Sequence, residues 1–323
     1  MLLSIIIPTY IDEERSLDRL KLCIKAFDCQ TQKDDYEIIV VDDGSKIHVS
    51  SFLKMNNFKN FRIVRKKHSG LASAYNYGVN IARGERIFLG VDDNIPHRDA
   101  VKNIFQTIKH YDESYMLMGN EINLMFVTAY KEIITPKYFD GIDVDKHKKE
   151  FSLEIEKFPG ITENDIENRL SELFELGKVV GNYAYFEKYI SDLNNSDYHW
   201  ICWRPGAIVI SKAKYLEIGG YDEEFDPSNW YSDIEFGYRA HKKGLKLVFE
   251  SQIKFLHLNH SKFFRSHPEE KRCFDYMAKK HKDIKLAMMP FLWSRRDYVE
   301  FTNMLERIDE LFKTELREIS YEN

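Results

Sequence analysis

Polar residues follow three apolar stretches of the sequence and are the first candidates for chemistry. They are Pro8, Thr9 and Tyr10 after the first stretch, Asp42 and Asp43 after the second, and Asp92 and Asp93 after the third. The chain has neither a Gly-x-Gly-x-x-Gly run nor a P-loop, so no glycine cradle of the usual kind holds a phosphate. Carboxylates repel phosphate unless a divalent cation lies between them. The pattern therefore indicates a nucleotide diphosphate that is bridged to the protein by a metal ion.

A further carboxylate lies at the start of a predicted helix. Ser232 and Glu235 have the spacing of a capping box, and Gly244 is expected to end the helix. Asp233 falls in the first turn, where the helix dipole favours a carboxylate over the protonated acid. Asp233 and Glu235 point to different faces of the helix, so one site can use only one of them.

Strands and helices alternate in the part of the chain that carries the aspartate pairs. Strands are expected at residues 2–8, 37–41, 61–64 and 86–91, and helices at residues 17–27 and 71–82. Such alternation predicts a parallel sheet with covering helices. In these sheets ligands bind outside the carboxyl ends of the strands, which is where the polar groups are expected to lie.

The rest of the chain is predicted in less detail. Amphipathic helices are expected at residues 151–158 and 166–174, the second with Thr162 as N-cap and Gly177 as its end. This region is either a solvated helical insertion or an element that shapes an acceptor site or forms a homodimer. An alternating strand at residues 246–249 is followed by a short loop and then by His257 and His260.

The composition is that of a globular protein: 43% of the 323 residues are hydrophobic and 14% are aromatic. A net charge of −5 gives no argument for nucleic-acid binding. The four cysteines show no Cys-x-x-Cys spacing, so neither a zinc site nor a disulfide framework is expected. The first apolar run is too short for a signal sequence or a membrane span, and a cytoplasmic protein is expected.

The motifs, taken in order, resemble those of family 2 glycosyltransferases with the GT-A fold. The resemblance covers roughly residues 3–96 and 203–262, and residues 219–239 are similar to the acceptor-side motif of the chondroitin-polymerase and β-1,4-galactosyltransferase style. The chain departs from the family pattern at Ser232, where the family has glutamate. It departs again at Gly90 or Val91, where the family's Asp-x-Asp motif has its first acid.

The resemblance implies a role for each matching position. Asp233 would be the catalytic base, and Asp93 with His257 would hold Mn²⁺ or Mg²⁺, with His260 as the alternative histidine. The nucleotide would be bound by Pro8, Thr9, Tyr10, Asp42, Asp43, Ser69, Gly70, Asn76 and Asp92. The acceptor or sugar would be bound by Trp203, Gly206, Trp230 and Glu235.

The implied reaction is an inverting, metal-dependent transfer of a sugar from a UDP-sugar to an acceptor hydroxyl. The acceptor can be a glycan, a peptide or a small molecule. Two alternatives stay open. One is a retaining transferase of the polypeptide N-acetylgalactosaminyltransferase type, which carries asparagine where this chain has Asp233. The other is an inactive protein that binds a nucleotide sugar or a glycan.

Four segments are expected along the chain. Residues 1–115 would form the nucleotide-sugar-binding half, 116–199 a helical insertion, 200–262 the acceptor half of the same GT-A domain, and 263–323 a helical extension. The extension begins in a basic stretch. Lys262 and Arg265 are candidates for covering the leaving diphosphate, and peripheral contact with an anionic lipid surface is the alternative for this stretch.

Overall fold

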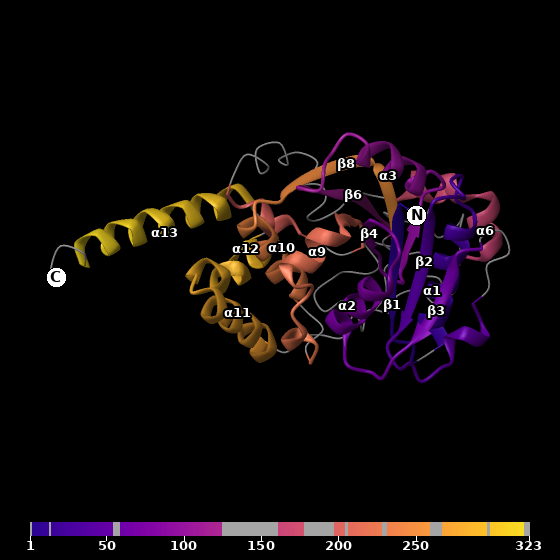
Figure 1. Ribbon diagram of the computed structural model, residues 1–323, viewed down its shortest axis with the longest axis horizontal. Coiled ribbons are helices and arrows are strands. Elements are labelled where there is room, and N and C mark those ends of the chain that lie inside the picture. Colours follow the sequence, from indigo (N-terminus) through magenta and orange to yellow (C-terminus); the bar gives the residue numbers. More distant parts are fainter. Residues whose placement is uncertain are drawn as a thin grey trace, which may run out of the picture. The chain divides into compact units, whose positions relative to one another are not determined.

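A computed structural model of the chain describes residues 2–12, 14–53, 59–124, 161–177, 197–203, 206–227, 231–258, 267–295 and 298–319 (Figure 1). The chain divides into two compact units, Met1–Lys262 and Phe263–Asn323. Several predicted features lie outside the described residues. They are the helix at 151–158 and the side chains of Trp230, His260, Lys262 and Arg265.

The first unit is built on a mixed sheet whose described strands run in the order β3-β2-β1-β4-β7-β6-β8-β5. The strands are β1 (Leu3–Thr9), β2 (Tyr36–Asp42), β3 (Phe61–Arg65), β4 (Arg86–Leu89), β5 (Asn94–Pro96), β6 (Tyr115–Leu124), β7 (Ile208–Ser211) and β8 (Lys246–Leu258). Strands β1 to β4 are parallel to one another, as the sequence predicts. Strand β7 runs antiparallel to β4 and β6, β8 runs parallel to β6, and β5 runs antiparallel to β8.

Helices cover both faces of this sheet (Figure 1). They are α1 (Glu14–Asp28), α2 (Leu71–Ile81), α3 (Ala100–Ile108), α6 (Glu163–Asn168), α7 (Leu170–Leu176), α9 (Lys212–Ile218) and α10 (Ser232–Lys242). On one face, Ile5 and Ile7 of β1 share a core with the apolar stripes of α1 and α3. On the other face α2 approaches so closely that a Cβ at Gly78 would lie 2.4 Å from Ile6 Cγ2. Because both faces are covered, β1 and β2 read as nearly continuous apolar runs, interrupted by Ser4 and Glu37.

The prediction of a short strand followed by a loop at residues 246–257 is wrong. Residues 246–258 form one strand instead of a strand, a loop and a second segment, so His257 lies in the sheet and not in a loop. Residues 246–250 pair with 115–119 of β6, and residues 254–258 pair with 120–124. The three residues between the paired stretches of β8 are absorbed as a bulge, which interrupts the sequence pattern without ending the strand.

The predicted helical insertion also differs from the structure in its described parts. Residues 115–124 are strand β6, in the middle of the sheet. The helix predicted at 166–174 is two short helices, α6 and α7, which meet at Arg169. Thr162 caps α6 and Gly177 ends α7, as predicted. These helices are not solvated on all sides, because Ile166 and Leu173 are fully buried in a core shared with β5 and β8.

Helix α10 begins without the predicted capping box. Its N-cap is Tyr231, which has a left-handed backbone (φ 69°, ψ 0°) and makes no side-chain cap hydrogen bond. Glu235 is instead 0% exposed and forms an ion pair with Arg239 one turn later. The partly buried guanidinium attracts the buried carboxylate more strongly than a backbone N–H does, and the capping box is lost. Gly244 does follow the helix with a positive φ of 80°.

The second unit is helical in its described residues. It contains α11 (His267–His281), the 3-10 helix η5 (Ile284–Met288), α12 (Met289–Arg295) and α13 (Tyr298–Ile319). Lys285 joins η5 to α13 through an ion pair with Asp309 at 2.5 Å. None of the helices in the described ranges of the chain combines the length and the apolar character that crossing a membrane requires.

Candidate functional site

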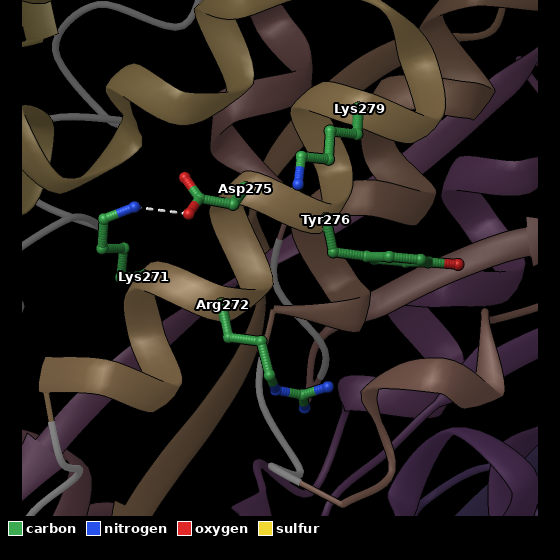
Figure 2. A pocket seen from close by; sticks show the side chains of 5 residues that line it. All are labelled: Lys271, Arg272, Asp275, Tyr276 and Lys279. Atoms are coloured by element: carbon green, nitrogen blue, oxygen red, sulfur yellow. Dashed lines mark hydrogen bonds and ion pairs between the residues drawn. The ribbon is translucent and has the colours of Figure 1, made fainter.

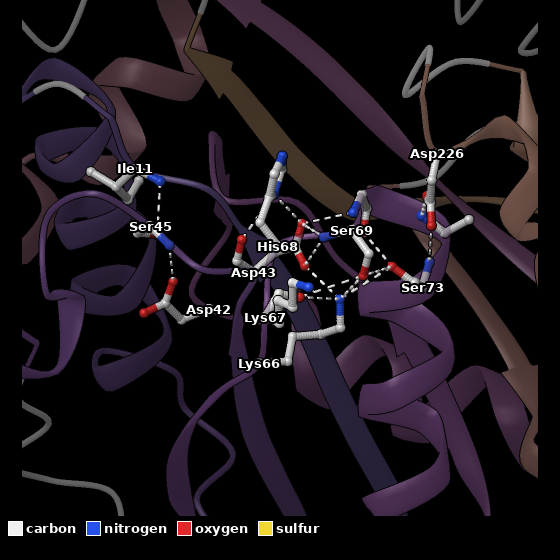
Figure 3. A network of polar contacts seen from close by, with 12 residues as sticks. Ile11, Asp42, Asp43, Ser45, Lys66, Lys67, His68, Ser69, Ser73 and Asp226 are labelled. Atoms are coloured by element: carbon white, nitrogen blue, oxygen red, sulfur yellow. Dashed lines mark hydrogen bonds and ion pairs between the residues drawn. The ribbon is translucent and has the colours of Figure 1, made fainter.

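The carboxylate of Asp43 lies at the centre of a polar network at the end of β2 (Figure 3). Its Oδ1 accepts hydrogen bonds from Lys66 Nζ at 2.6 Å and from the Ser69 backbone N–H at 3.1 Å. Its Oδ2 accepts from the Gly70 backbone N–H at 2.8 Å and faces His68 Nδ1 at 2.7 Å. All four lone-pair positions of the carboxylate are therefore occupied by donors from the segment between β3 and α2.

The neighbouring Asp42 has a different set of partners. Its Oδ1 accepts from the Ser45 backbone N–H at 2.8 Å, and its Oδ2 is paired with Arg65 at 2.7 Å. Ser45 in turn accepts a hydrogen bond from the backbone N–H of Ile11 (Figure 3). Asp42 thus ties together the turns that follow β1 and β2, and we assign it a structural role.

Two rings lie beside the Asp43 network. Tyr10 and His68 stack with their centroids 4.3 Å apart and an interplanar angle of 27°. Tyr10 is 38% exposed, so the pair offers an aromatic surface next to the carboxylate. Such a surface can support a planar base. The predicted nucleotide residues Tyr10, Asp43, Ser69 and Gly70 are therefore brought together at one place.

Asp226 joins this nucleotide-side turn to the segment that precedes α10. Its carboxylate accepts hydrogen bonds from the backbone N–H groups of Ala72 (2.6 Å) and Ser73 (3.0 Å) in the first turn of α2. Burial raises the pKa of Asp226, and the hydrogen bonds from Ser73 and Ala72 oppose that rise. A Cβ at Gly70 would lie 2.5 Å from Asp226 Cβ, so glycine is required for this contact.

Asn76, which was predicted to bind the nucleotide, instead forms hydrogen bonds within the protein. Its Nδ2 donates to the Tyr221 carbonyl at 2.9 Å, and its Oδ1 accepts from Tyr215 Oη at 2.8 Å and from the Tyr221 backbone N–H at 2.8 Å. The side chain therefore holds α2 against the turn after α9. The structure does not bring Asn76 to the Asp43 network.

Three candidate carboxylates act electrostatically on the buried side chain of Tyr75. Its pKa is raised well above the usual value by burial and by the negative charges of Asp92, Asp93 and Asp233. The Tyr75 hydroxyl donates to the Gly90 carbonyl at the end of β4, which fixes the ring there. Asp92 and Asp93 follow β4, whereas Asp233 lies in the first turn of α10. Residues far apart in the sequence thus form one acidic region.

Asp92 is also held from β1, because Thr9 Oγ1 donates to its Oδ2 at 2.6 Å. Asp93 contacts the next candidate in the sheet: its Oδ2 lies 3.2 Å from His257 Nε2. On the other side of the same ring, His257 Nδ1 lies 3.0 Å from Asn123 Oδ1. The predicted metal ligands Asp93 and His257 therefore do lie together.

The residues that were predicted to bind the acceptor or sugar lie in different surroundings in the structure. Both carboxylate oxygens of Glu235 accept from Arg239, at distances of 2.6–2.9 Å, and the residue is 0% exposed. Trp203 is 1% exposed, and its side chain lies against Gly237 of α10, so it packs beneath that helix. Gly206 has φ 102° and sits beside Asn94 Nδ2. In this arrangement Glu235 and Trp203 support α10 instead of facing a ligand.

Comparison with known proteins places this geometry in a family. The model of "Glycosyl transferase family 2" matches residues 4–162. The chain is 26% identical to a chondroitin synthase of Escherichia coli over 258 residues, or 75% of this chain and 32% of that protein. It is 28% identical to a chondroitin synthase of Pasteurella multocida over 250 residues, or 75% of this chain and 23% of that protein.

The chain therefore carries a glycosyl transferase family 2 domain at residues 4–162. It spans less than a third of the length of each of these two relatives. The crystal structure of S. aureus TarS 1–349 in complex with UDP-GlcNAc has the same GT-A fold, with a TM-score of 0.56 and 14% sequence identity. The likeness covers 90% of this chain and 71% of that one. The predicted family and the predicted fold are both confirmed.

The side chains of Asp92, Asp93 and His257 are of the kinds that bind a divalent cation. One carboxylate oxygen and one imidazole nitrogen meet at Asp93 and His257, and Asp92 lies next to Asp93. Mn²⁺ and Mg²⁺ bind such oxygen and imidazole ligands and take the remaining ones from phosphate and water. Within the described residues no group of three or more His, Cys, Asp or Glu side chains meets the geometry of a metal site.

Sequence reasoning missed several residues of the glycosyltransferase site. Lys66 and His68 directly follow β3, and the rule that ligands gather at the carboxyl ends of parallel strands would have found them. Asn123 was missed because its segment was assigned to a helical insertion. Asp226 carries no local signal, since its partners lie more than 150 residues earlier in the chain.

A separate basic groove lies in the second unit, on helix α11. It has a volume of about 470 Å³ and is lined by Lys271, Arg272, Asp275, Tyr276 and Lys279 (Figure 2). Asp275 forms an ion pair with Lys271, as the dashed line in Figure 2 shows, so part of the positive charge is neutralised. All five lining residues belong to one helix, which makes the groove a feature of the helix surface.

Proposed function

We propose that this protein transfers a sugar from a UDP-sugar to an acceptor hydroxyl, with inversion at the anomeric carbon and with Mn²⁺ or Mg²⁺ as cofactor. The observation that carries the proposal is the acidic region around Tyr75. There the charge of the candidate base Asp233 and those of Asp92 and Asp93, which follow β4, all act on the same buried hydroxyl. A base and a diphosphate-binding pair must lie within reach of one bound sugar for the transfer to occur.

In this proposal Asp233 accepts the proton of the acceptor hydroxyl as the oxygen attacks the anomeric carbon. Its place in the first turn of α10 favours the charged form that a base requires. General-base catalysis of this kind contributes on the order of 10²–10⁴ to the rate. The divalent cation would stabilise the negative charge of the departing diphosphate.

The Asp43 network would bind the uracil base. Because both carboxylate oxygens are already used by donors, the uracil N–H would take the lone pair that now faces His68. His68 lies at the surface beside Tyr10, so its ring can move aside while the base stacks there. Thr9 would hold Asp92 in place at the neighbouring strand end.

The test is a screen of UDP-sugars against the purified protein with Mn²⁺ or Mg²⁺, in which release of UDP is measured. UDP-GlcNAc is a suitable first donor, since it is the ligand in one structural neighbour. Metal-dependent release with one donor, and a product of inverted anomeric configuration by NMR, would support the proposal. A product with retained configuration would favour the retaining alternative. Binding of UDP without any hydrolysis or transfer would favour the inactive binding protein.

A further inference from the structure

Three adjacent strands present polar side chains in one row beside the acidic region. Asn94 of β5, His257 of β8 and Asn123 of β6 are register partners across the sheet. Register partners on neighbouring strands point to the same face, so their side chains meet. The bulge between the two paired stretches of β8 sets this register, because without it Asn123 would face another residue of β8.

The contact between Asn123 and His257 decides where the imidazole carries its proton. Asn123 Oδ1 lies 3.0 Å from Nδ1, and an amide oxygen can only accept a hydrogen bond. The proton is therefore on Nδ1, and in the neutral ring the lone pair is on Nε2. That nitrogen lies 3.2 Å from Asp93 Oδ2, which is also an acceptor.

Without a metal ion, a protonated imidazole can make this contact by donating Nε2–H to Asp93; the neutral ring with its proton on Nδ1 instead offers the Nε2 lone pair to a cation beside Asp93. His257 is only 7% exposed, so water competes little with Asp93 and Asn123 for its ring nitrogens. A histidine that holds a metal ion typically donates its other ring N–H to an oxygen, which orients the ring and raises its basicity. Asn123 supplies that oxygen here.

We propose that Asn123 is a positioning residue for a divalent cation: it holds the proton of His257 on Nδ1 and thereby presents Nε2, beside Asp93, to the metal ion. The inference rests on the metal dependence in the proposed function and extends it to a residue outside the ligand set. Asn123 touches neither sugar nor diphosphate in this account. It acts through the orientation and the tautomer of His257.

The first experiment measures Mn²⁺ affinity in the presence of saturating UDP, with free Mn²⁺ followed by EPR. Asn123→Ala removes the acceptor and is expected to weaken Mn²⁺ binding about 10–100-fold. Asn123→Asp keeps an oxygen in place and is expected to restore binding. The matched control is Asn120→Ala, which changes an equally buried asparagine of the same strand and should leave Mn²⁺ affinity at the wild-type value.

The proposal is overturned if folded Asn123→Ala protein binds Mn²⁺ as wild type does, or if Asn120→Ala weakens binding to the same degree. Asn123→Leu, which fills the volume but cannot accept a hydrogen bond, replaces the alanine variant if that variant fails to fold. If wild-type protein binds no Mn²⁺ with UDP, the metal dependence in the proposed function fails and this inference fails with it. If Mn²⁺ binding depends on Asn123 but no sugar is transferred, only the proposed function fails.

A second experiment uses no variant of Asn123. Long-range ¹H–¹⁵N spectra of histidine-labelled protein with Mg²⁺ and UDP report which ring nitrogen of each histidine carries the proton. The His257 signals are assigned by their loss in His257→Gln. The proposal predicts the Nδ1–H tautomer for His257, and observation of the Nε2–H tautomer would overturn it.

Discussion

Two regions at the same edge of the sheet hold their carboxylates in contrasting ways. At the end of β2, Asp43 is surrounded by donors, among them Lys66 and two backbone N–H groups. The pKa of Tyr75 is raised first by burial and then by the negative charges of three carboxylates, two that follow β4 and one in α10. We call these the donor-rich turn and the acidic region.

The contrast indicates what each region requires from a ligand. In the donor-rich turn the negative charge of Asp43 is balanced within the protein, so a neutral N–H of a base can exchange with an existing donor. In the acidic region the charges of Asp92, Asp93 and Asp233 add to one another, and a bound diphosphate would add more. A divalent cation reduces that repulsion, so metal dependence should belong to the acidic region alone.

The largest expected effect is on the transfer rate, and it arises in the acidic region. Asp233→Asn keeps the shape of the side chain and removes the proton acceptor, so transfer should fall by about 10²–10⁴. UDP affinity should be retained, because the lost interaction is confined to the transition state. The measurement is kcat for transfer together with calorimetric UDP binding.

Glu235→Gln is the control for that experiment, since it lies on the same helix and is bound to Arg239. The protein should lose roughly 1–3 kcal/mol of stability, because a buried charge-assisted pair becomes a neutral one. Most activity should remain. A folded Glu235→Gln protein without activity, or an Asp233→Asn protein with a near wild-type rate, would reverse the assignment of the base.

The next effect separates the two regions by their need for metal. Asp93→Ala or excess EDTA should weaken UDP binding by about 10–100-fold, the range typical of an altered metal site. The physical reason is the repulsion between diphosphate and the remaining carboxylates. Calorimetry of UDP with and without Mn²⁺ measures the effect. Equal UDP affinity in both conditions would remove the contrast between the regions.

A smaller effect is expected from the donor-rich turn. Asp43→Asn weakens an interaction with the uracil N–H, and UDP affinity should fall by about tenfold, or 1.4 kcal/mol. The ratio of affinities with and without Mn²⁺ should stay unchanged, which distinguishes this variant from Asp93→Ala. Asp42→Asn should alter stability and leave UDP affinity unchanged, because its partners are Arg65 and Ser45. The opposite result for the two aspartates would assign base recognition to Asp42.

The last expected effect concerns the stability of the protein at low pH, which His199 makes pH-dependent. Burial, with the nearby His241 on α10, lowers the pKa of His199 to about 4. His199 is therefore protonated near pH 6.5 in the unfolded chain but only near pH 4 in the folded protein. Stability should fall on acidification across this window, by roughly 1–2 kcal/mol between pH 7 and 5. Urea unfolding at both pH values measures it, and His199→Gln should reduce the difference.

The sequence by itself predicted the parallel strands, the aspartates at their ends and the family. These features are local: a strand buried on both faces must be apolar along its length, and a carboxylate at its end interrupts that pattern visibly. The order of the strands then places Thr9, Asp43 and Asp92 at one edge, because the carboxyl ends of parallel strands coincide.

Only the tertiary structure decided how these side chains are used. Asp42 and Asp43 are adjacent in sequence, yet they have different partners. Asp42 forms an ion pair with Arg65, whereas Asp43 accepts hydrogen bonds from the turn after β3. Glu235 matched a capping box, but Arg239 offered a stronger partner inside the fold. Asn123 had no motif at all, because its meeting with His257 depends on a bulge and on the pairing of two strands more than 100 residues apart. Glu235 and Arg239 are only four residues apart, but the burial of Glu235 that strengthens their pair is set by the fold, as is the long-range register that brings Asn123 to His257.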